Sequence, residues 1–326
     1  MMELLVFKEK LRRFYGKYSL YIIPLIKFAV GYLAFYLINS NVGFMARLKN
    51  PLIPVIMGLV ASIVPYGVTA FFAGCLLLTH VVQVSLEIAL IIAVFMMAVI
   101  LLYYGFRPGD GYLLLLTPMM FFFNIPYVVP ILVGLSGSIV SIIPVSSGIC
   151  MYYIIMYLKQ NAGVLAGSSV SEMATRFIQI AKSLFANELM WVMIAAFAAA
   201  VLVVYIIKNL PVDHAWPIAI IAGVITQLIV IFVGDMKFEL TISIASMVIG
   251  MVIAVVLALV YQFFVFAVDY TRTEYLQYED DEYHYYVKAV PKIAVSAPDV
   301  KVQRIYTRKT VKTDKKQEHY ELGGRC

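Results

Sequence analysis

The chain has 326 residues, of which 63% are hydrophobic and 13% are charged. Soluble domains contain about 45–50% apolar and about 25% charged residues, so this composition excludes a water-soluble fold and predicts that most of the chain lies in a bilayer. Continuous apolar runs favour helices over a transmembrane β-barrel, in which apolar and polar residues would alternate.

Residues 1–17 contain five Lys and Arg residues, and an apolar run follows over residues 18–38. Lys and Arg accumulate in cytoplasmic segments beside membrane spans, so the N-terminus is predicted to be cytoplasmic. The run is longer than the apolar core of a signal peptide and no small-residue cleavage site ends it, which predicts an uncleaved first span.

A short phrase occurs twice, as PVIMGLVASIV at residues 54–64 and as PILVGLSGSIV at residues 130–140, with six of eleven positions identical. Helix breakers follow each copy, and another pair precedes the second copy: Pro65 and Gly67, Pro144 and Gly148, and Asn124 and Pro126. The pattern predicts an internal repeat of short apolar helices that end at these breakers. Because the second copy lies in the fourth apolar run after the first, both copies are expected to point the same way.

The chain as a whole is predicted to be an all-α, polytopic membrane protein with 8 to 10 crossings. Its ten apolar runs cover residues 18–38, 51–64, 68–82, 88–104, 112–123, 127–143, 148–158, 189–207, 215–233 and 240–268. A helix of 14 or 15 residues spans a little over 20 Å, less than the roughly 30 Å hydrocarbon core, so the short runs are either short spans or a re-entrant pair.

Residues 159–187 separate a first membrane region (18–158) from a second region of three spans (188–268). Within this linker, residues 168–187 place apolar and polar side chains on opposite faces of a helix. The pattern predicts an amphipathic helix that lies in the headgroup plane or packs on its own protein.

Residues 269–326 form a tail that is rich in acids and tyrosines at first and then basic, with eleven Lys and Arg residues. The positive charge predicts a cytoplasmic C-terminus, so both termini are cytoplasmic and the number of crossings is even. The tail either solubilises this end or docks a cytoplasmic partner. Residues 288–295 alternate enough to pair as a strand with such a partner.

The sequence carries no phosphate-binding loop, no metal-binding helix motif, no nucleophile elbow and no nucleic-acid-binding module. We therefore expect neither an enzyme nor a cofactor, and no nucleic-acid partner. The three cysteines, Cys75, Cys150 and Cys326, are too scattered for a disulfide framework or a zinc site.

Ionisable residues within apolar runs predict a transport pathway, since they are costly in a membrane. Lys27 and Glu87 are a candidate charge pair, and His80 is a candidate proton relay. Alternatively, Lys27 extends its side chain to the interface. The broken segments are a second candidate pathway, built from Pro65, Gly67, Asn124, Pro144 and Gly148, with tight helix packing as the alternative.

The tail segment YEDDEYHYYVKAVPK (residues 278–292), behind a multi-span body, resembles polytopic membrane proteins of Gram-positive anaerobes that are generically labelled membrane proteins or permeases. The resemblance implies no defined activity and no site residues. The sequence favours a small-solute transporter, either as a monomer or as a homo-oligomer. The alternatives are a non-catalytic membrane scaffold and the membrane subunit of an ATP-driven transporter with a separate ATPase.

Overall fold

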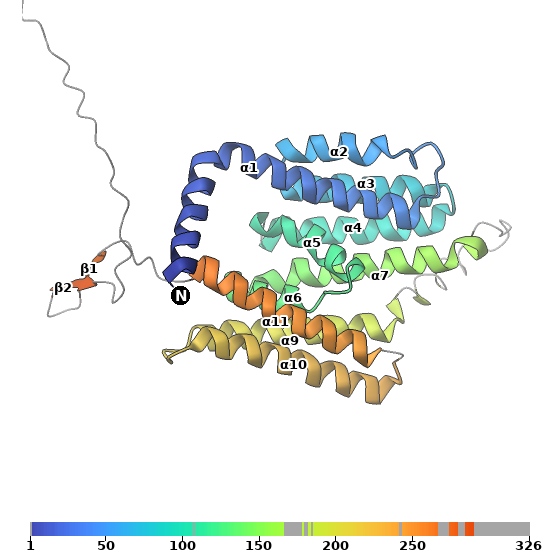
Figure 1. Cartoon of the computed structure of the whole chain (residues 1–326). Coiled ribbons are helices and arrows are strands. Elements are labelled where there is room, and N and C mark those ends of the chain that lie inside the picture. The colour runs from blue at the N-terminus through green and yellow to red at the C-terminus, as the bar shows by residue number, and fades with distance from the viewer. Residues whose placement is uncertain are drawn as a thin grey trace, which may run out of the picture. The chain divides into compact units, whose positions relative to one another are not determined.

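The computed structural model describes residues 2–106, 108–165, 178, 182–183, 185–240, 243–266, 274–279 and 284–289. Contacts divide the chain into two compact units, a helical unit that covers Glu3–Val268 and a second unit that covers Asp269–Cys326. Figure 1 labels the elements of both units.

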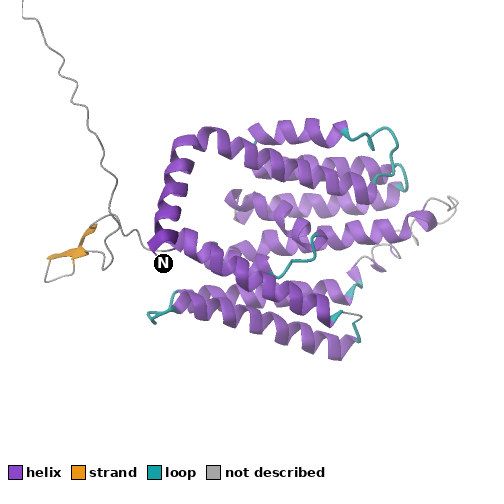
Figure 2. Cartoon of the chain, in the orientation of Figure 1, coloured by secondary structure: helices purple, strands orange, loops and turns teal. Residues whose placement is uncertain are grey.

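The described part of the first unit is built from helices, so the prediction of an all-helical body is confirmed (Figure 2). Two short 3-10 helices, η1 (Pro108–Asp110) and η2 (Ile139–Ser141), lie between the α-helices. The α-helices are α1 (Met2–Val42), α2 (Leu52–Ile63), α3 (Tyr66–Val82), α4 (Leu86–Phe106), α5 (Gly111–Phe122), α6 (Val128–Ser136), α7 (Ile142–Leu165), α9 (Glu188–Lys208), α10 (Ala215–Phe238) and α11 (Ile244–Phe266).

Six of the described helices are long and apolar enough to cross a membrane, whereas α2 and α3 are shorter apolar helices. The six segments are Val6–Val42, Leu86–Phe106, Ile139–Asn161, Glu188–Lys208, Ala215–Phe238 and Ile244–Val265. This set has the length and composition of a multi-pass membrane protein.

Two clusters of buried side chains form the core of the helical unit. One cluster joins α6, α9, α10 and α11, and the other joins α1, α3 and α4. Helices α5 and α7 contribute to both: Leu113 and Ile149 belong to the first cluster, and Leu115 and Leu158 belong to the second. α5 and α7 therefore connect the two halves of the unit.

The two ends of the helical unit can be told apart by side-chain contacts, and we name them after Lys208 and His80. At the Lys208 end, the Lys208 ammonium donates to the backbone oxygen of Leu135 (2.9 Å), which joins the end of α9 to the end of α6. At the His80 end, His80 Nδ1 accepts from the backbone N–H of Met45 (3.3 Å), which joins α3 to the loop after α1.

Helices α5 and α6 form a hairpin whose two ends both lie at the Lys208 end. The Ser141 hydroxyl donates to Asp110 Oδ2 (2.5 Å), so the residues just before α5 meet those just after α6. α5 has 12 residues and α6 has 9. At 1.5 Å per residue they are about 18 Å and about 14 Å long, so neither reaches across a 30 Å hydrocarbon core.

The tip of this hairpin is a well-formed helix end at Asn124. Asn124 has φ 59°, in the left-handed region that Asn tolerates better than most residues. Its N–H donates to the Phe121 oxygen (3.1 Å), and the N–H of Ile125 donates to the Met120 oxygen (3.0 Å). These two bonds are the Schellman pattern, and Pro126 follows it, so the break predicted at this point is confirmed.

The break predicted at Pro144 and Gly148 is wrong, because α7 runs through both residues from Ile142 to Leu165. Pro144 is the third residue of α7, where a helical N–H has no partner within the helix in any case, so proline is tolerated there. The chain breaks instead at Gly137, whose backbone is extended. The run predicted over residues 127–143 is therefore two elements, and α7 continues past residue 158, the expected end of the first membrane region.

The first helix begins earlier than the apolar run alone predicts. α1 is continuous from Met2 to Val42 and contains Pro24. It bends along its length in Figure 1, and an internal proline removes one helical hydrogen bond and favours a bend. Most of the amphipathic helix predicted over residues 168–187 lies outside the described residues.

The second unit contains an antiparallel hairpin of β1 (Glu274–Glu279) and β2 (His284–Ala289). Its register pairs Glu274 with Ala289 and Glu279 with His284. Of the strand predicted over residues 288–295, only Lys288 and Ala289 belong to β2, where they pair within the chain, and residues 290–295 lie outside the described residues. A docking role for the tail stays a prediction.

Candidate functional site

Lys27 and Glu87 lie far apart, so the predicted charge pair does not form. Lys27 Nζ lies 5.9 Å from the centre of the Tyr66 ring, at the start of α3. Glu87 accepts from the Ser85 hydroxyl (2.5 Å) at the start of α4, which follows the end of α3. The 17 residues of α3 separate the two sites by about 25 Å, and Lys27 lies near the Lys208 end.

His80 is fully buried at the other end of α3. Its Nδ1 accepts from Met45 N–H, and its Nε2 is a buried atom without a hydrogen-bond partner. The helical unit contains two cavities, and His80 is not among the described residues that line them. The geometry therefore gives His80 a structural contact, which fixes the loop after α1.

Pro65 lies between α2 and α3, as predicted, whereas Gly67 is the second residue of α3 and does not break a helix. Pro65 is the N-cap of α3 and has an extended backbone. A Cβ on Gly67 would lie 2.6 Å from the Tyr103 hydroxyl oxygen, so Gly67 is needed where α3 meets the end of α4. The Tyr103 hydroxyl donates in turn to the Pro108 oxygen. The break is thus a packing junction at the Lys208 end.

Gly148 has a packing role as well. A Cβ on Gly148 would lie 2.7 Å from Thr117 Cβ, so α7 and α5 touch at this point. Gly58 and Gly134 occupy the same position in the two phrases and also lie in tight contacts. A Cβ on Gly58 would lie 3.1 Å from Tyr32, and a Cβ on Gly134 would lie 2.6 Å from Val204. Close helix approach, the alternative to a pathway, accounts for all three glycines.

Asn124 is the predicted site residue that does line a polar cavity. This cavity has a volume of about 390 Å³ and extends from the tip of the α5–α6 hairpin to the His80 end; we call it the tip cavity. Its described lining comes from the tip, α7, α9 and α11: Phe121, Asn124, Pro126, Tyr127, Tyr152, Tyr153, Met156, Tyr157, Gln160, Asn187, Leu189, Met193, Ser243 and Ser246. No Asp, Glu, Lys, Arg or His occurs among these described residues.

Aromatic rings form one wall of the tip cavity. Tyr152 and Tyr153 lie 4.7 Å and 6.0 Å from the Phe121 ring, measured between ring centres. On another side of the cavity, a Cβ on Gly250 of α11 would lie 2.9 Å from the Tyr127 ring and 3.3 Å from the backbone oxygen of Asn124. A glycine at position 250 therefore lets α11 press against the tip.

A second cluster of polar residues lies at the base of the hairpin, and the sequence analysis did not predict it. Asp110 is only 7% exposed and bonds Ser141, while Lys208 also reaches the Gly137 oxygen (3.4 Å). The available signal was an acid directly before an apolar run, with a serine shortly after the second phrase.

The α5–α6 hairpin therefore separates two polar regions, the tip cavity on one side and the Asp110–Ser141 group on the other. Hydroxyl and amide groups in the tip cavity can donate and accept hydrogen bonds, and its rings can stack on a planar solute. Within the described residues, no group of three or more His, Cys, Asp or Glu side chains could hold a metal ion. Comparison of the chain with models of protein families, with curated proteins and with solved structures found no match.

Proposed function

We propose that this chain is a small-solute transporter or permease of the cell membrane, and that the tip cavity is its solute-binding site. One observation carries the proposal: a pair of half-length helices ends in a cavity lined by amides and hydroxyls, within a mostly apolar helical unit. Half-length helices of this kind are the usual place for substrate sites in secondary transporters, because backbone groups at helix breaks become available to a ligand.

The lining indicates an uncharged polar solute. Asn124, Gln160 and Asn187 supply amides, and Ser243 and Ser246 supply hydroxyls, whereas no described lining residue carries a formal charge at neutral pH. A charged solute would lose its hydration without gaining a counter-charge from these residues. A volume of about 390 Å³ falls at the small end of ligand pockets.

The proposed topology has eight crossings and one re-entrant hairpin. α1, α2, α3, α4, α7, α9, α10 and α11 would each cross, and α5–α6 would enter and leave at the Lys208 end. α2 is as short as α5, but we count it as a crossing because it connects the loop at the His80 end to the junction at Pro65 and Gly67, whereas the chain turns back after α5 at Asn124. Contact between the Phe7 and Phe264 rings (6.5 Å) supports this count, since it brings the start of α1 next to the end of α11. The basic N-terminus then predicts that the Lys208 end is cytoplasmic.

In this topology the tip cavity faces outward. Transport requires that the same site later opens toward the cytoplasm, past the base of the hairpin. The Ser141–Asp110 and Lys208–Leu135 hydrogen bonds hold that base together, so they would form the inner gate. The internal repeat remains part of the proposal, with α2 and α6 as its corresponding short helices.

The variant Asn124→Gly tests the proposal, because glycine keeps the left-handed backbone of the tip and removes only the amide. The purified protein is screened by thermal shift against neutral sugars, polyols, nucleosides and amides, and hits are assayed by uptake into proteoliposomes. Loss of a hydrogen bond to the solute should weaken binding about tenfold, equivalent to about 1.4 kcal/mol.

Asn209→Gly is the matched control, since Asn209 is an exposed asparagine that caps α9 at the opposite end. It should bind and transport the same solutes as the wild type. If Asn124→Gly and Asn209→Gly bind every hit with equal affinity, the tip cavity is not the solute site.

A further inference from the structure

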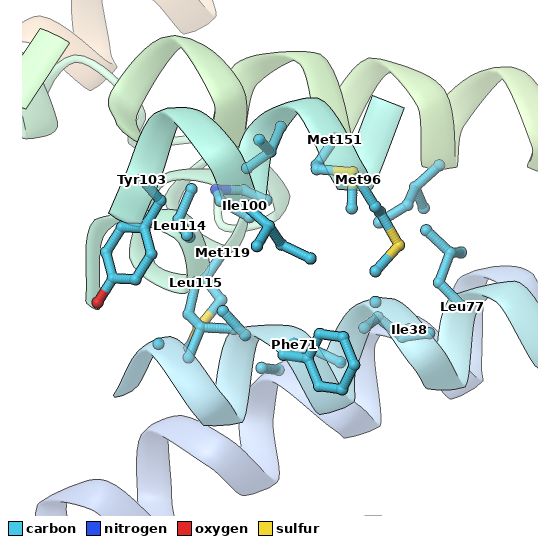
Figure 3. A pocket seen from close by; sticks show the side chains of 18 of the residues that line it. Ile38, Phe71, Leu77, Met96, Ile100, Tyr103, Leu114, Leu115, Met119 and Met151 are labelled. Carbon is cyan, nitrogen blue, oxygen red and sulfur yellow. The ribbon is translucent and has the colours of Figure 1, made fainter. Parts of the chain in front are cut away.

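A second cavity of about 350 Å³ lies among α1, α3, α4, α5 and α7, and we call it the apolar cavity. Figure 3 shows it from close by, with Phe71, Met96, Met119 and Met151 among the side chains that surround the space. Its described lining is nearly all aliphatic or aromatic, with the hydroxyls of Tyr103 and Tyr104 as the polar side-chain groups. A space of this kind does not hold water, which needs polar partners.

The apolar cavity is elongated along α3. Its lining on this helix runs from Gly67 to Leu77, which corresponds to about 15 Å at 1.5 Å per residue. That length is half of the roughly 30 Å hydrocarbon core, so the cavity matches the depth of one leaflet.

The apolar cavity also has exposed walls. Phe71 on α3 and Tyr104 on α4 line it and are 46% and 60% exposed. Both helices belong to the unit whose apolar composition suggests a membrane location, so the surface next to these side chains would face lipid. A hydrocarbon chain could therefore enter sideways from the bilayer.

A lysine near one end of the apolar cavity indicates what kind of molecule fills the cavity. Gly67 lines the cavity, and the residue before it is Tyr66. Lys27 Nζ lies 5.9 Å from the centre of the Tyr66 ring. Lys27 is partly exposed. At the same end, the Tyr103 hydroxyl donates to a backbone oxygen and the buried Asp110 accepts from Ser141. Lys27 is thus positioned to meet an anionic group outside the cavity.

We propose that the apolar cavity holds one acyl chain of a membrane phospholipid whose phosphate lies at Lys27. The acyl chain replaces the missing contacts along α3 and α4, and the phosphate pairs with the ammonium at the membrane interface. This inference does not depend on the proposed transport function, because the apolar cavity and the tip cavity have no described lining residue in common.

The experiment uses the full chain in nanodiscs that contain a phospholipid with a photoreactive diazirine in one acyl chain. After irradiation, cross-linked peptides are mapped by mass spectrometry. Cross-links should concentrate on α3 and α4. Ala70→Phe fills the cavity from α3 and should abolish them, whereas Ala195→Phe, on an exposed position of α9, should leave them unchanged.

Lys27→Gln tests the headgroup contact without altering the cavity. Loss of one interfacial cation should lower cross-linking about fivefold. Lys17→Gln is the control for this variant. Lys17 also lies over a tyrosine ring, that of Tyr18 in α1, but it is more exposed than Lys27. Equal cross-linking of α9, α10 and α11, or no effect of Ala70→Phe, would overturn the acyl-chain site. An unchanged yield in Lys27→Gln would overturn the phosphate contact.

Discussion

His80 and Gly148 illustrate how residues that suggest a pathway in a sequence can serve packing in the fold. A histidine in an apolar run is compatible with proton transfer, yet the ring of His80 accepts a backbone hydrogen bond from Met45 and lines neither cavity among the described residues. A glycine after a repeated phrase suggests a helix break, yet Gly148 lies within α7. In both cases the partner is remote in sequence, and only the fold supplies it.

At the residue scale, His80→Ala is expected to destabilise the protein and His80→Asn to restore most of the loss. Alanine leaves the Met45 N–H without its acceptor, at a cost of about 1–3 kcal/mol. The amide oxygen of asparagine can take the place of Nδ1. Thermal unfolding in detergent measures the effect.

The same pair of variants separates a structural role from a proton relay. Once a transported solute is known, His80→Asn should transport it at the wild-type rate under a proton gradient. A relay would require that both variants lose proton-coupled uptake, since asparagine cannot exchange protons.

At the scale of the element, α5 and α7 are the pair that connects the two core clusters. Their contact depends on Gly148, where the Thr117 side chain fills the space that a Cβ would need. Thr117 and its neighbour Pro118 lie inside α5, so the short helix presents a fixed surface to α7. This contact fixes where the hairpin tip lies along α7.

Gly148→Ala is therefore expected to cost about 1–3 kcal/mol by overpacking the α5–α7 contact. Gly105→Ala is the matched control, since a Cβ on Gly105 of α4 would meet no atom within 4 Å. The control should gain up to about 1 kcal/mol of helix propensity. Unfolding titrations of both variants measure the difference, and equal stability would contradict the assignment of Gly148 to packing.

At the scale of the whole helical unit, the proposed topology makes a prediction about accessibility. In a variant with Cys75, Cys150 and Cys326 replaced by serine, single cysteines are introduced at exposed positions of the two ends. Gly109→Cys and Asp213→Cys lie at the Lys208 end, and Lys49→Cys and Gln83→Cys lie at the His80 end.

An impermeant maleimide added to intact cells should label Lys49→Cys and Gln83→Cys, and should label the other two only after lysis. The physical basis is the positive charge of residues 1–17, which favours the cytoplasm for the Lys208 end. Labelling of Gly109→Cys in intact cells, together with Gln83→Cys, would be incompatible with eight crossings and a re-entrant hairpin.

The sequence by itself determined that the body of the protein is built from apolar helices, and it determined where most of these helices lie in the chain. Continuous apolar runs must form helices in a bilayer, because no water is present to satisfy their backbone groups. The break at Asn124 and Pro126 was also predictable, since both residues act locally on the backbone. The break after the second phrase was misplaced, because a proline in the first turn of a helix is not a breaker.

The tertiary structure alone decided which side chains meet. It separated Lys27 from Glu87 by the length of α3, and it folded α5 and α6 into a hairpin through the bond between Asp110 and Ser141. It also brought Tyr152 and Gln160 of α7, Ser246 of α11 and the N-cap Asn187 of α9 to the tip at Asn124. Local sequence could not predict these contacts, because burial and helix packing bring together residues that are 28 to 122 positions apart in the chain.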